Sequence, residues 1–267
     1  MTKKMVFVDT SRCTGCKACS VACKCWNELP AEKTKLITSY QSHGDFTPTT
    51  WTYMTFTEKY EDGKVNWLTR KAQCFHCAEP WCLKACPQKA IYQTETGFVE
   101  IDRNKCVGCG YCTTNCPYGV PKVDPDLKKS VKCYGCINRV ESNLLPSCVH
   151  TCGPEALSFG DRDKMMVKAE TRLAEIQKTN PKAQLYGKDE MGGTTFCYLL
   201  MDKPEAYGLP VNPKMPLSLF LWKDVIQPVG KLVMGAAAAA VLVGVGSNLL
   251  RGNYRGSVHE NEEGGGH

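Results

Sequence analysis

Sixteen of the eighteen cysteines in this sequence fall into four blocks, and their spacing is that of metal ligands. The blocks are Cys13, Cys16, Cys19 and Cys23; Cys74, Cys77, Cys82 and Cys86; Cys106, Cys109, Cys112 and Cys116; and Cys133, Cys136, Cys148 and Cys152. Blocks one and three have the spacing C-x2-C-x2-C-x3-C, in which a tight loop presents three thiolates to one four-iron cube and the fourth cysteine reaches another. The sequence therefore predicts four 4Fe–4S clusters with cysteine ligands.

Two other uses of dense cysteines fit this spacing poorly. In a disulfide scaffold, cysteines only two residues apart could not all find partners at the required Cα separation. Structural zinc favours isolated C-x2-C pairs, which Cys133 and Cys136 superficially offer. Triplets such as Cys13, Cys16 and Cys19 do not suit zinc.

An internal duplication indicates how the blocks combine. Residues 7–23 parallel residues 100–116, and residues 80–92 resemble residues 146–159 more loosely. Blocks two and three are joined by two short apolar strands around a turn, which is the hairpin of a two-cluster ferredoxin. The expected strands are Ala90–Tyr92 and Phe98–Ile101.

The strand before block one and the strand after block four are left without such neighbours. We expect Met5–Val8 and Ala156–Phe159 to pair and complete a second ferredoxin around the first. The predicted fold class is α+β, with two pseudo-symmetric two-cluster bacterial ferredoxin modules, one inserted in the other, plus one C-terminal transmembrane helix. The four-cluster domain covers 1–160, with the outer module at 1–30 and 126–160 and the inner module at 70–125.

The shared-ligand rule then assigns the sixteen cysteines to four predicted sites. Site 1 comprises Cys13, Cys16, Cys19 and Cys152, and site 2 comprises Cys133, Cys136, Cys148 and Cys23. Site 3 comprises Cys74, Cys77, Cys82 and Cys116, and site 4 comprises Cys106, Cys109, Cys112 and Cys86.

The C-terminal part of the chain carries one long apolar segment. Leu232–Leu250 has no formal charge and is long enough, as a helix, to span a membrane, although a buried soluble helix is the alternative. We assign 217–252 to a transmembrane anchor and 253–267 to a flexible tail. Residues 161–216 form a partner-binding segment with a helix at Asp163–Lys178, a strand at Thr195–Met201 and a proline-rich connection.

Several other residues near the ligand blocks are expected to have packing or surface roles only. Cys25 and Cys197 are expected to be buried apolar thiols, and His76 and His150 to pack beside the ligands. Most lysines close to the blocks are expected on the solvated surface, although they could offset cluster charge. These lysines are Lys17, Lys24, Lys84, Lys105, Lys122 and Lys132.

The charge balance argues against a nucleic-acid partner. The formal net charge is +6, but sixteen thiolates around four oxidised cubes of about +2 each would contribute about −8. The loaded chain would then be close to neutral. No nucleotide-binding glycine loop and no pairing of nucleophile and base stands out in the sequence. The predicted function is therefore electron relay, with no catalytic residues and with partners at both ends.

The four-block arrangement over residues 5–160 resembles the iron–sulfur subunits of the molybdenum or tungsten bis-pterin oxidoreductases, which include dimethyl sulfoxide, polysulfide and nitrate reductases and formate dehydrogenases. Three later features resemble the beta subunit of membrane-bound formate dehydrogenase. These are Gly192-Gly193-Thr194 before a strand, Asp202-Lys203-Pro204, and the single C-terminal span preceded by Trp222-Lys223.

This resemblance implies a bis-pterin catalytic subunit that oxidises formate, a membrane cytochrome b subunit that reduces quinone, and this chain relaying electrons between them. It also implies an extracytoplasmic ferredoxin domain, whereas the lysines and arginines flanking the span favour a cytoplasmic one. The first residues lack an export signal, so export would depend on a partner. The alternatives are the equivalent subunit of a membrane-bound hydrogenase or of another bis-pterin reductase, and a membrane-tethered stand-alone ferredoxin.

Overall fold

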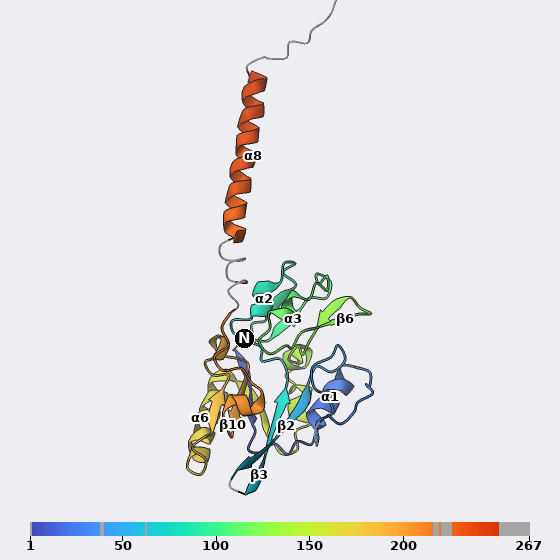
Figure 1. The fold of residues 1–267 in the computed structure, drawn as a ribbon, viewed down its shortest axis with the longest axis vertical. Helices are drawn as coiled ribbons and strands as arrows, with labels where there is room; N and C mark the ends of the chain where they lie inside the picture. Colours follow the sequence, from blue (N-terminus) through green and yellow to red (C-terminus); the bar gives the residue numbers. More distant parts are fainter. Residues whose placement is uncertain (1, 38–39, 62, 216–218, 220–225, 251–267) are drawn as a thin grey trace, which may run out of the picture. The chain divides into compact units, whose positions relative to one another are not determined.

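The computed structural model describes residues 2–37, 40–61, 63–215, 219 and 226–250. The chain divides into two compact units, Met1–Met215 and Pro216–His267, and each is considered by itself (Figure 1). The predicted flexible tail at 253–267 lies outside the described residues, as does most of 217–225.

A four-stranded sheet forms the centre of the first unit. Its strands lie in the order β8, β1, β10, β9. Their bounds are β1 Lys4–Asp9, β8 Leu157–Asp161, β9 Gln184–Tyr186 and β10 Phe196–Leu200. Strand β1 is antiparallel to β8, with Val6 opposite Phe159, and this is the pairing predicted for the two unpartnered strands. On its other side β1 runs parallel to β10, a neighbour that the sequence did not predict.

Strand β1 is buried on both faces, which explains its unbroken apolar sequence. Val6 and Val8 face the core that contains Phe75 and Phe98. Met5 and Phe7 point to the opposite face because side chains alternate along a strand. The sheet thus separates two layers, one built around the cysteines and one built around a helix.

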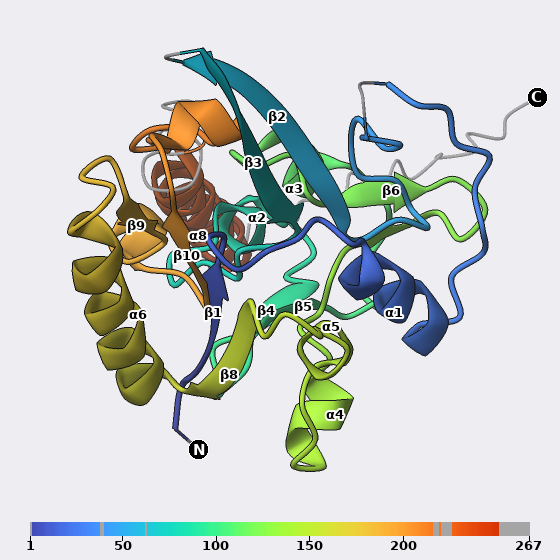
Figure 2. The same cartoon turned by 90° about the horizontal axis from the view of Figure 1, so that it is seen from below.

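That helix is α6, Arg162–Gln177, which begins and ends within one residue of the predicted bounds. Ala169 of α6 is fully buried against Met5 and Phe7, and Leu173 and Ile176 pack beside it, so one face of the helix is apolar. Figure 2 shows α6 beside the sheet. The segment after residue 160 therefore belongs to the same compact unit as the cysteine blocks.

Short hairpins and helices surround the cysteines on the other side of the sheet. The hairpins are β4 Ile91–Gln93 with β5 Val99–Ile101, and β6 Lys122–Asp124 with β7 Lys129–Val131. The helices are α1 Ala18–Trp26, α2 Trp81–Ala85, α3 Tyr111–Thr114, α4 Ile137–Glu141 and α5 Ser147–His150. Helix α1 packs against α5, and α2 packs against α3. Each pair joins a helix from one cysteine block to a helix from another.

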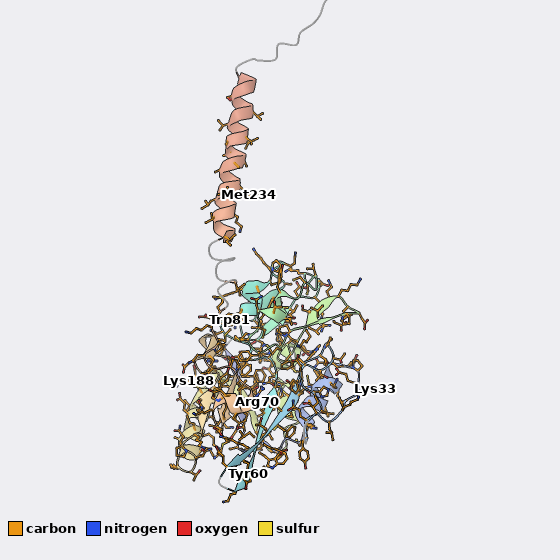
Figure 3. The ribbon with its side chains drawn as sticks, viewed as in Figure 1. Lys33, Tyr60, Arg70, Trp81, Lys188 and Met234 are labelled. Carbon is orange, nitrogen blue, oxygen red and sulfur yellow. The ribbon has the colours of Figure 1, made fainter. Side chains whose placement is uncertain are left out.

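A long hairpin was not predicted. It consists of β2, Tyr53–Glu61, and β3, Lys64–Ala72. Its far end is exposed, whereas the last five residues of β3 are buried and lead directly into the second cysteine block. Figure 3 shows Tyr60 at the free end of the hairpin and Arg70 inside the body. Two 3₁₀ turns, η1 Glu190–Gly192 and η2 Pro204–Tyr207, complete the unit.

The described part of the second unit is one helix, α8, Gln227–Leu250. Residues Val229–Ser247 have a mean hydropathy of 1.9 and none of them is buried, so the helix is long and apolar enough to cross a membrane. Leu232 and Met234 are about three-quarters exposed, and Figure 3 shows Met234 on this helix. The predicted apolar C-terminal helix is present.

Charge placed inside α8 should release the chain from membranes. Arginine at the middle of a membrane helix costs about 3 kcal/mol, so Ala238→Arg with Val241→Arg should cost about 6 kcal/mol. We expect the wild-type chain to stay in the pellet when native membranes are washed in alkaline carbonate, and the double variant to appear in the supernatant. Lys231→Arg keeps a cation at the edge of the span and is the matched control. Equal retention of all three proteins would contradict a spanning role for α8.

Candidate functional site

The first group of cysteines lines a small cavity of about 30 Å³. Its cysteines are Cys13, Cys16, Cys19 and Cys152, which is the set predicted for site 1. Cys13 follows β1 and Cys152 precedes β8, so the antiparallel pairing of these two strands brings together ligands that are far apart in sequence. The remaining wall is mostly apolar, including Val8, Met54 and Leu157.

A second small cavity, of about 10 Å³, has the same construction in the middle of the chain. Its cysteines are Cys86, Cys106, Cys109 and Cys112, the set predicted for site 4. Here the hairpin of β4 and β5 connects the blocks, with Ile91 opposite Ile101. Both isoleucines line the cavity, so this site too is shielded by apolar side chains.

Within site 3, and likewise within site 2, the cysteines are close enough to one another to interact electrostatically. Burial raises the pKa of Cys77 well above its ordinary value, and charges on Cys74, Cys116 and Cys82 raise it further. These four residues are the predicted site 3.

The set predicted for site 2 behaves in the same way. Burial raises the pKa of Cys23 to about 12, with Cys148 and Cys136 adding to the increase against the opposing effect of Lys71. Burial likewise raises the pKa of Cys133, and Cys23 is the thiol that adds most to it. The structure thus brings the four cysteines of site 1 and the four of site 4 to one cavity each, and it places cysteines of sites 2 and 3 near one another. The assignment of all sixteen cysteines to four sites stays a prediction.

The chemistry of these donors suits iron–sulfur cubes. At sites 1 and 4, four thiols converge from two parts of the chain, and much of the remaining wall is apolar. Buried thiols with raised pKa values give up their protons only to a strongly cationic centre, such as the irons of a cluster. At site 4 the backbone N–H groups of Gly108 and Ser130 donate hydrogen bonds to the Cys106 sulfur, at 3.5 and 3.3 Å. Such bonds favour the electron-rich form of a cluster.

Neighbouring sites are in packing contact, which gives them an order. Burial raises the pKa of Cys19 of site 1, and Cys148 of site 2 raises it further, so these two thiols lie close together. The apolar core around them also includes Cys77 of site 3. Cys133 of site 2 packs with Cys74 of site 3. Cys82 of site 3 packs with Cys112 of site 4. The order is therefore site 1, site 2, site 3, site 4.

The two ends of this series reach the surface. Cys16 of site 1 and Cys109 of site 4 are exposed, whereas the other fourteen cysteines of the four sites are buried or partly buried. The two residues are the middle cysteines of the duplicated C-x2-C-x2-C loops. The internal duplication therefore produces two equivalent exposed ends.

The two cysteines outside the four sites differ from each other. Cys197, in β10, is fully buried as predicted, and burial raises its pKa to about 12. The prediction of a buried thiol at Cys25 is wrong, because that side chain is exposed. Cys19 and Cys23 lie four residues apart on the inward face of α1, and Cys25 lies two residues further along, on the outward face.

His76, inside the second block, has the packing role predicted for it. Its Nδ1 accepts a hydrogen bond of 2.8 Å from the backbone N–H of Val99, and its ring stacks on Phe196. Burial lowers the pKa of this histidine well below its ordinary value, so the ring is neutral. His150 is exposed and lies away from these contacts.

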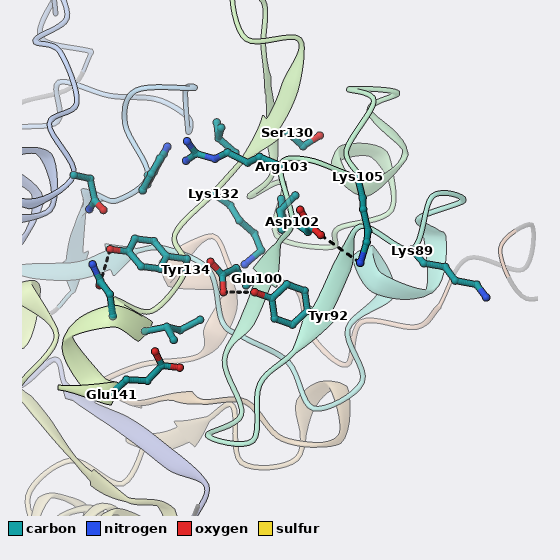
Figure 4. A pocket seen from close by; sticks show the side chains of 16 residues that line it. Lys89, Tyr92, Glu100, Asp102, Arg103, Lys105, Ser130, Lys132, Tyr134 and Glu141 are labelled. Atoms are coloured by element: carbon teal, nitrogen blue, oxygen red, sulfur yellow. Dashed lines mark hydrogen bonds and ion pairs between the residues drawn. The ribbon is translucent and has the colours of Figure 1, made fainter. Parts of the chain in front are cut away.

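A wide groove of about 1040 Å³ opens on the surface beside these sites. Figure 4 shows charged and aromatic side chains along it, including Arg103, Lys132 and Tyr134. Tyr92 donates a 2.6 Å hydrogen bond to Glu100, and Lys105 pairs with Asp102 at 3.3 Å. The groove is open and of mixed charge, and its polar groups are largely engaged with one another.

Comparisons with known proteins agree with this chemistry. A family model described as a 4Fe-4S dicluster domain matches residues 65–162, and a second with the same description matches residues 12–90. The formate dehydrogenase iron-sulfur subunit of Haemophilus influenzae is 41% identical over 88% of this chain and 77% of its own length. The formate dehydrogenase-O iron-sulfur subunit of Escherichia coli is 39% identical, covering 96% of this chain and 88% of its own. The formate dehydrogenase 2 subunit beta (cytochrome c-553) of Nitratidesulfovibrio vulgaris is 35% identical, covering 76% and 96%.

The loop between Cys133 and Cys136 should tolerate no side chain at Gly135. This glycine has a φ of +77°, and a Cβ would overlap the ring of Phe98, which is fully buried and cannot move aside. Gly135→Ala should cost about 2–4 kcal/mol, from backbone strain and overpacking together. Denaturant titration of the loaded protein, followed by visible absorbance, measures the loss.

Gly119→Ala is the matched control for this substitution. Gly119 also has a positive φ, of +63°, but a Cβ there would meet open space. Its replacement should cost only about 1–2 kcal/mol, because the backbone strain alone remains. Equal midpoints for the two variants would contradict the close packing of the Gly135 loop.

Proposed function

Because this chain belongs to the family of formate dehydrogenase iron–sulfur subunits, we propose that it relays electrons from a formate-oxidising subunit to an acceptor in the membrane. It is the electron-transfer subunit of its family and not the catalytic one. The observation that carries the proposal is the pair of cavities that are each lined by the four cysteines of one predicted site. Four 4Fe–4S clusters would then lie at sites 1 to 4.

The sixteen cysteines would divide into two ferredoxin modules, one nested in the other. Two equivalent arrangements support this division. In one, β4 and β5 form a hairpin next to the packed helices α2 and α3. In the other, β1 and β8 pair next to the packed helices α1 and α5. The outer module would comprise 1–30 with 126–160 and the inner module 70–125, and residues 161–216 would bind a partner.

The chain's own residues would provide three things for the relay. The bound clusters would supply one-electron chemistry. Apolar side chains form much of the wall around sites 1 and 4, which would reduce the reorganisation that accompanies each change of charge. The packing of Cys19 with Cys148, and of Cys74 with Cys133, holds successive sites next to each other. The exposed ends at Cys16 and Cys109 would each face a partner.

The partners at those ends follow from the relatives and from α8. The relatives' names identify a formate dehydrogenase, so the electron donor would be a bis-pterin subunit containing molybdenum or tungsten. The acceptor would be a membrane cytochrome b, because α8 is long and apolar enough to cross a bilayer. The ferredoxin domain would lie on the extracytoplasmic side, as the family resemblance implies.

Replacing one proposed ligand should lower the iron content of the protein, whereas replacing a neighbouring free thiol should leave it unchanged. Cys23 and Cys25 lie in the same helix, but Cys23 is buried in site 2 and Cys25 is exposed. We expect about sixteen irons per wild-type chain and per Cys25→Ser chain, and about four fewer in Cys23→Ser. Iron and acid-labile sulfide analysis of anaerobically purified protein measures this. Wild-type protein with far fewer irons would overturn the assignment of four clusters.

Formate should reduce the clusters of the detergent-extracted native complex. We expect the brown absorbance near the visible maximum to bleach on anaerobic addition of formate and to return with a quinone. Metal analysis of the same sample should find molybdenum or tungsten. Bleaching by hydrogen in a nickel-containing complex would instead identify a hydrogenase subunit. A chain that purifies without either metal would be a stand-alone ferredoxin.

A further inference from the structure

Two lysines lie in the interior among the cysteines. Lys71 is 3% exposed and Lys132 is 5% exposed. Lysine is rarely buried to this degree, because removing an ammonium group from water costs several kcal/mol unless opposite charge surrounds it. Each ammonium must therefore have an electrostatic partner in the folded protein.

The neighbours of Lys71 come from two adjacent sites. Its side chain lines the cavity of site 1, beside Cys19. The thiols of Cys148, Cys19 and Cys133 lie close enough to interact with the charge of Lys71. Two of these thiols belong to site 2. The ammonium also lies 5.6 Å from the ring centroid of Phe196, a contact that favours the cation.

Lys132 has a corresponding position beside the next pair of sites, sites 2 and 3. Its ammonium donates hydrogen bonds to the backbone oxygens of Val99 and Cys133, the second at 2.9 Å. Cys133 follows it directly in the chain, and the thiols of Cys74 and Cys82 lie close enough to interact with its charge. Cys74 and Cys82 belong to site 3 and Cys133 to site 2. Lys132 therefore lies between these two sites.

A fixed cation in this position has a definite effect on a neighbouring cluster. A cube held by four thiolates is negatively charged, and reduction adds one more negative charge. A nearby ammonium stabilises the reduced form more than the oxidised form, and the low local dielectric inside the protein strengthens the interaction. The same charge on the surface would be screened by water and salt.

We propose that Lys71 and Lys132 are built-in counter-charges that raise the reduction potentials of the clusters on either side of them. Lys71 acts on sites 1 and 2, and Lys132 acts on sites 2 and 3. Site 2 is affected by both lysines and so forms the electron-accepting centre of the series. This inference rests on the proposed relay function, because it requires clusters at these sites.

The chain offers a matched control for Lys132. Lys105 also precedes the first cysteine of a block, since Lys105 is followed by Cys106 as Lys132 is followed by Cys133. The Lys105 side chain, however, is 66% exposed and pairs with Asp102. Removing it takes away a lysine at the same position in a block without removing a buried charge.

Redox titrations of the native complex, followed by electron paramagnetic resonance, test the proposal. The variants are Lys71→Met, Lys132→Met, Lys105→Met, Lys71→Arg and Lys132→Arg, each checked for iron content. Lys132→Met should lower the potentials of two cluster signals, reducing the ratio of reduced to oxidised cluster at a fixed potential by about tenfold, or about 59 mV. Lys71→Met should lower two signals as well, one of them shared with Lys132→Met. Lys105→Met and both arginine variants should resemble wild type.

The outcomes separate this proposal from the relay function itself. Wild-type complex without four cluster signals would refute the relay. Four signals whose potentials stay unchanged in both methionine variants would overturn the role of the lysines and leave the relay intact. Loss of iron in a methionine variant, with full iron in its arginine counterpart, would support the need for a buried charge. Equal loss in both would overturn it, because packing and not charge would then be the requirement.

Discussion

The structure depends on bringing thiols from distant parts of the chain together in fours. No block supplies a whole site, since Cys13 needs Cys152 and Cys106 needs Cys86. Strand pairing meets this requirement at both places, through β1 with β8 and through β4 with β5. The apolar core is correspondingly divided into several small clusters, and most of them contain cysteines. Metal binding and folding are therefore one process in a chain of this kind.

The same dependence explains why basic side chains appear in the interior. Thiolates and inorganic cubes together leave a net negative charge, which an apolar interior cannot hold without compensation. Lys71 and Lys132 lie where that charge is concentrated, and Arg70 is buried next to Lys71 at the end of β3. Strand β3 thus leads into the second cysteine block, and it also contains the two buried cations Arg70 and Lys71.

Local spacing allowed the sequence to predict the cysteine groups, the β1–β8 pairing and helix α6, because each rests on a short motif or a clear period. The hairpin of β2 and β3 escaped prediction, since its outer half is largely exposed and mixes polar with apolar side chains, and its inner half buries Arg70 and Lys71, residues expected on a surface. The parallel neighbour β10 was missed because such a pairing depends on tertiary contacts. Lys132 was noted beside a block but was expected in solvent, since the position of a residue in the sequence does not indicate how deeply its side chain is buried. The outward direction of Cys25 could have been read from the helical period.

The pairing of β1 with β8 also has a consequence for how the protein is made. A ribosome adds about 5–20 residues per second, so about 140 residues, or roughly 7–28 seconds, separate the appearance of Cys13 from that of Cys152. Site 4, whose cysteines all lie between Cys86 and Cys112, is complete far sooner. The nascent chain therefore carries five unprotected thiols near its N-terminus, Cys13, Cys16, Cys19, Cys23 and Cys25, while its middle is already able to fold. Anaerobic synthesis, or a chaperone that shields this N-terminal segment, would protect those thiols during the delay.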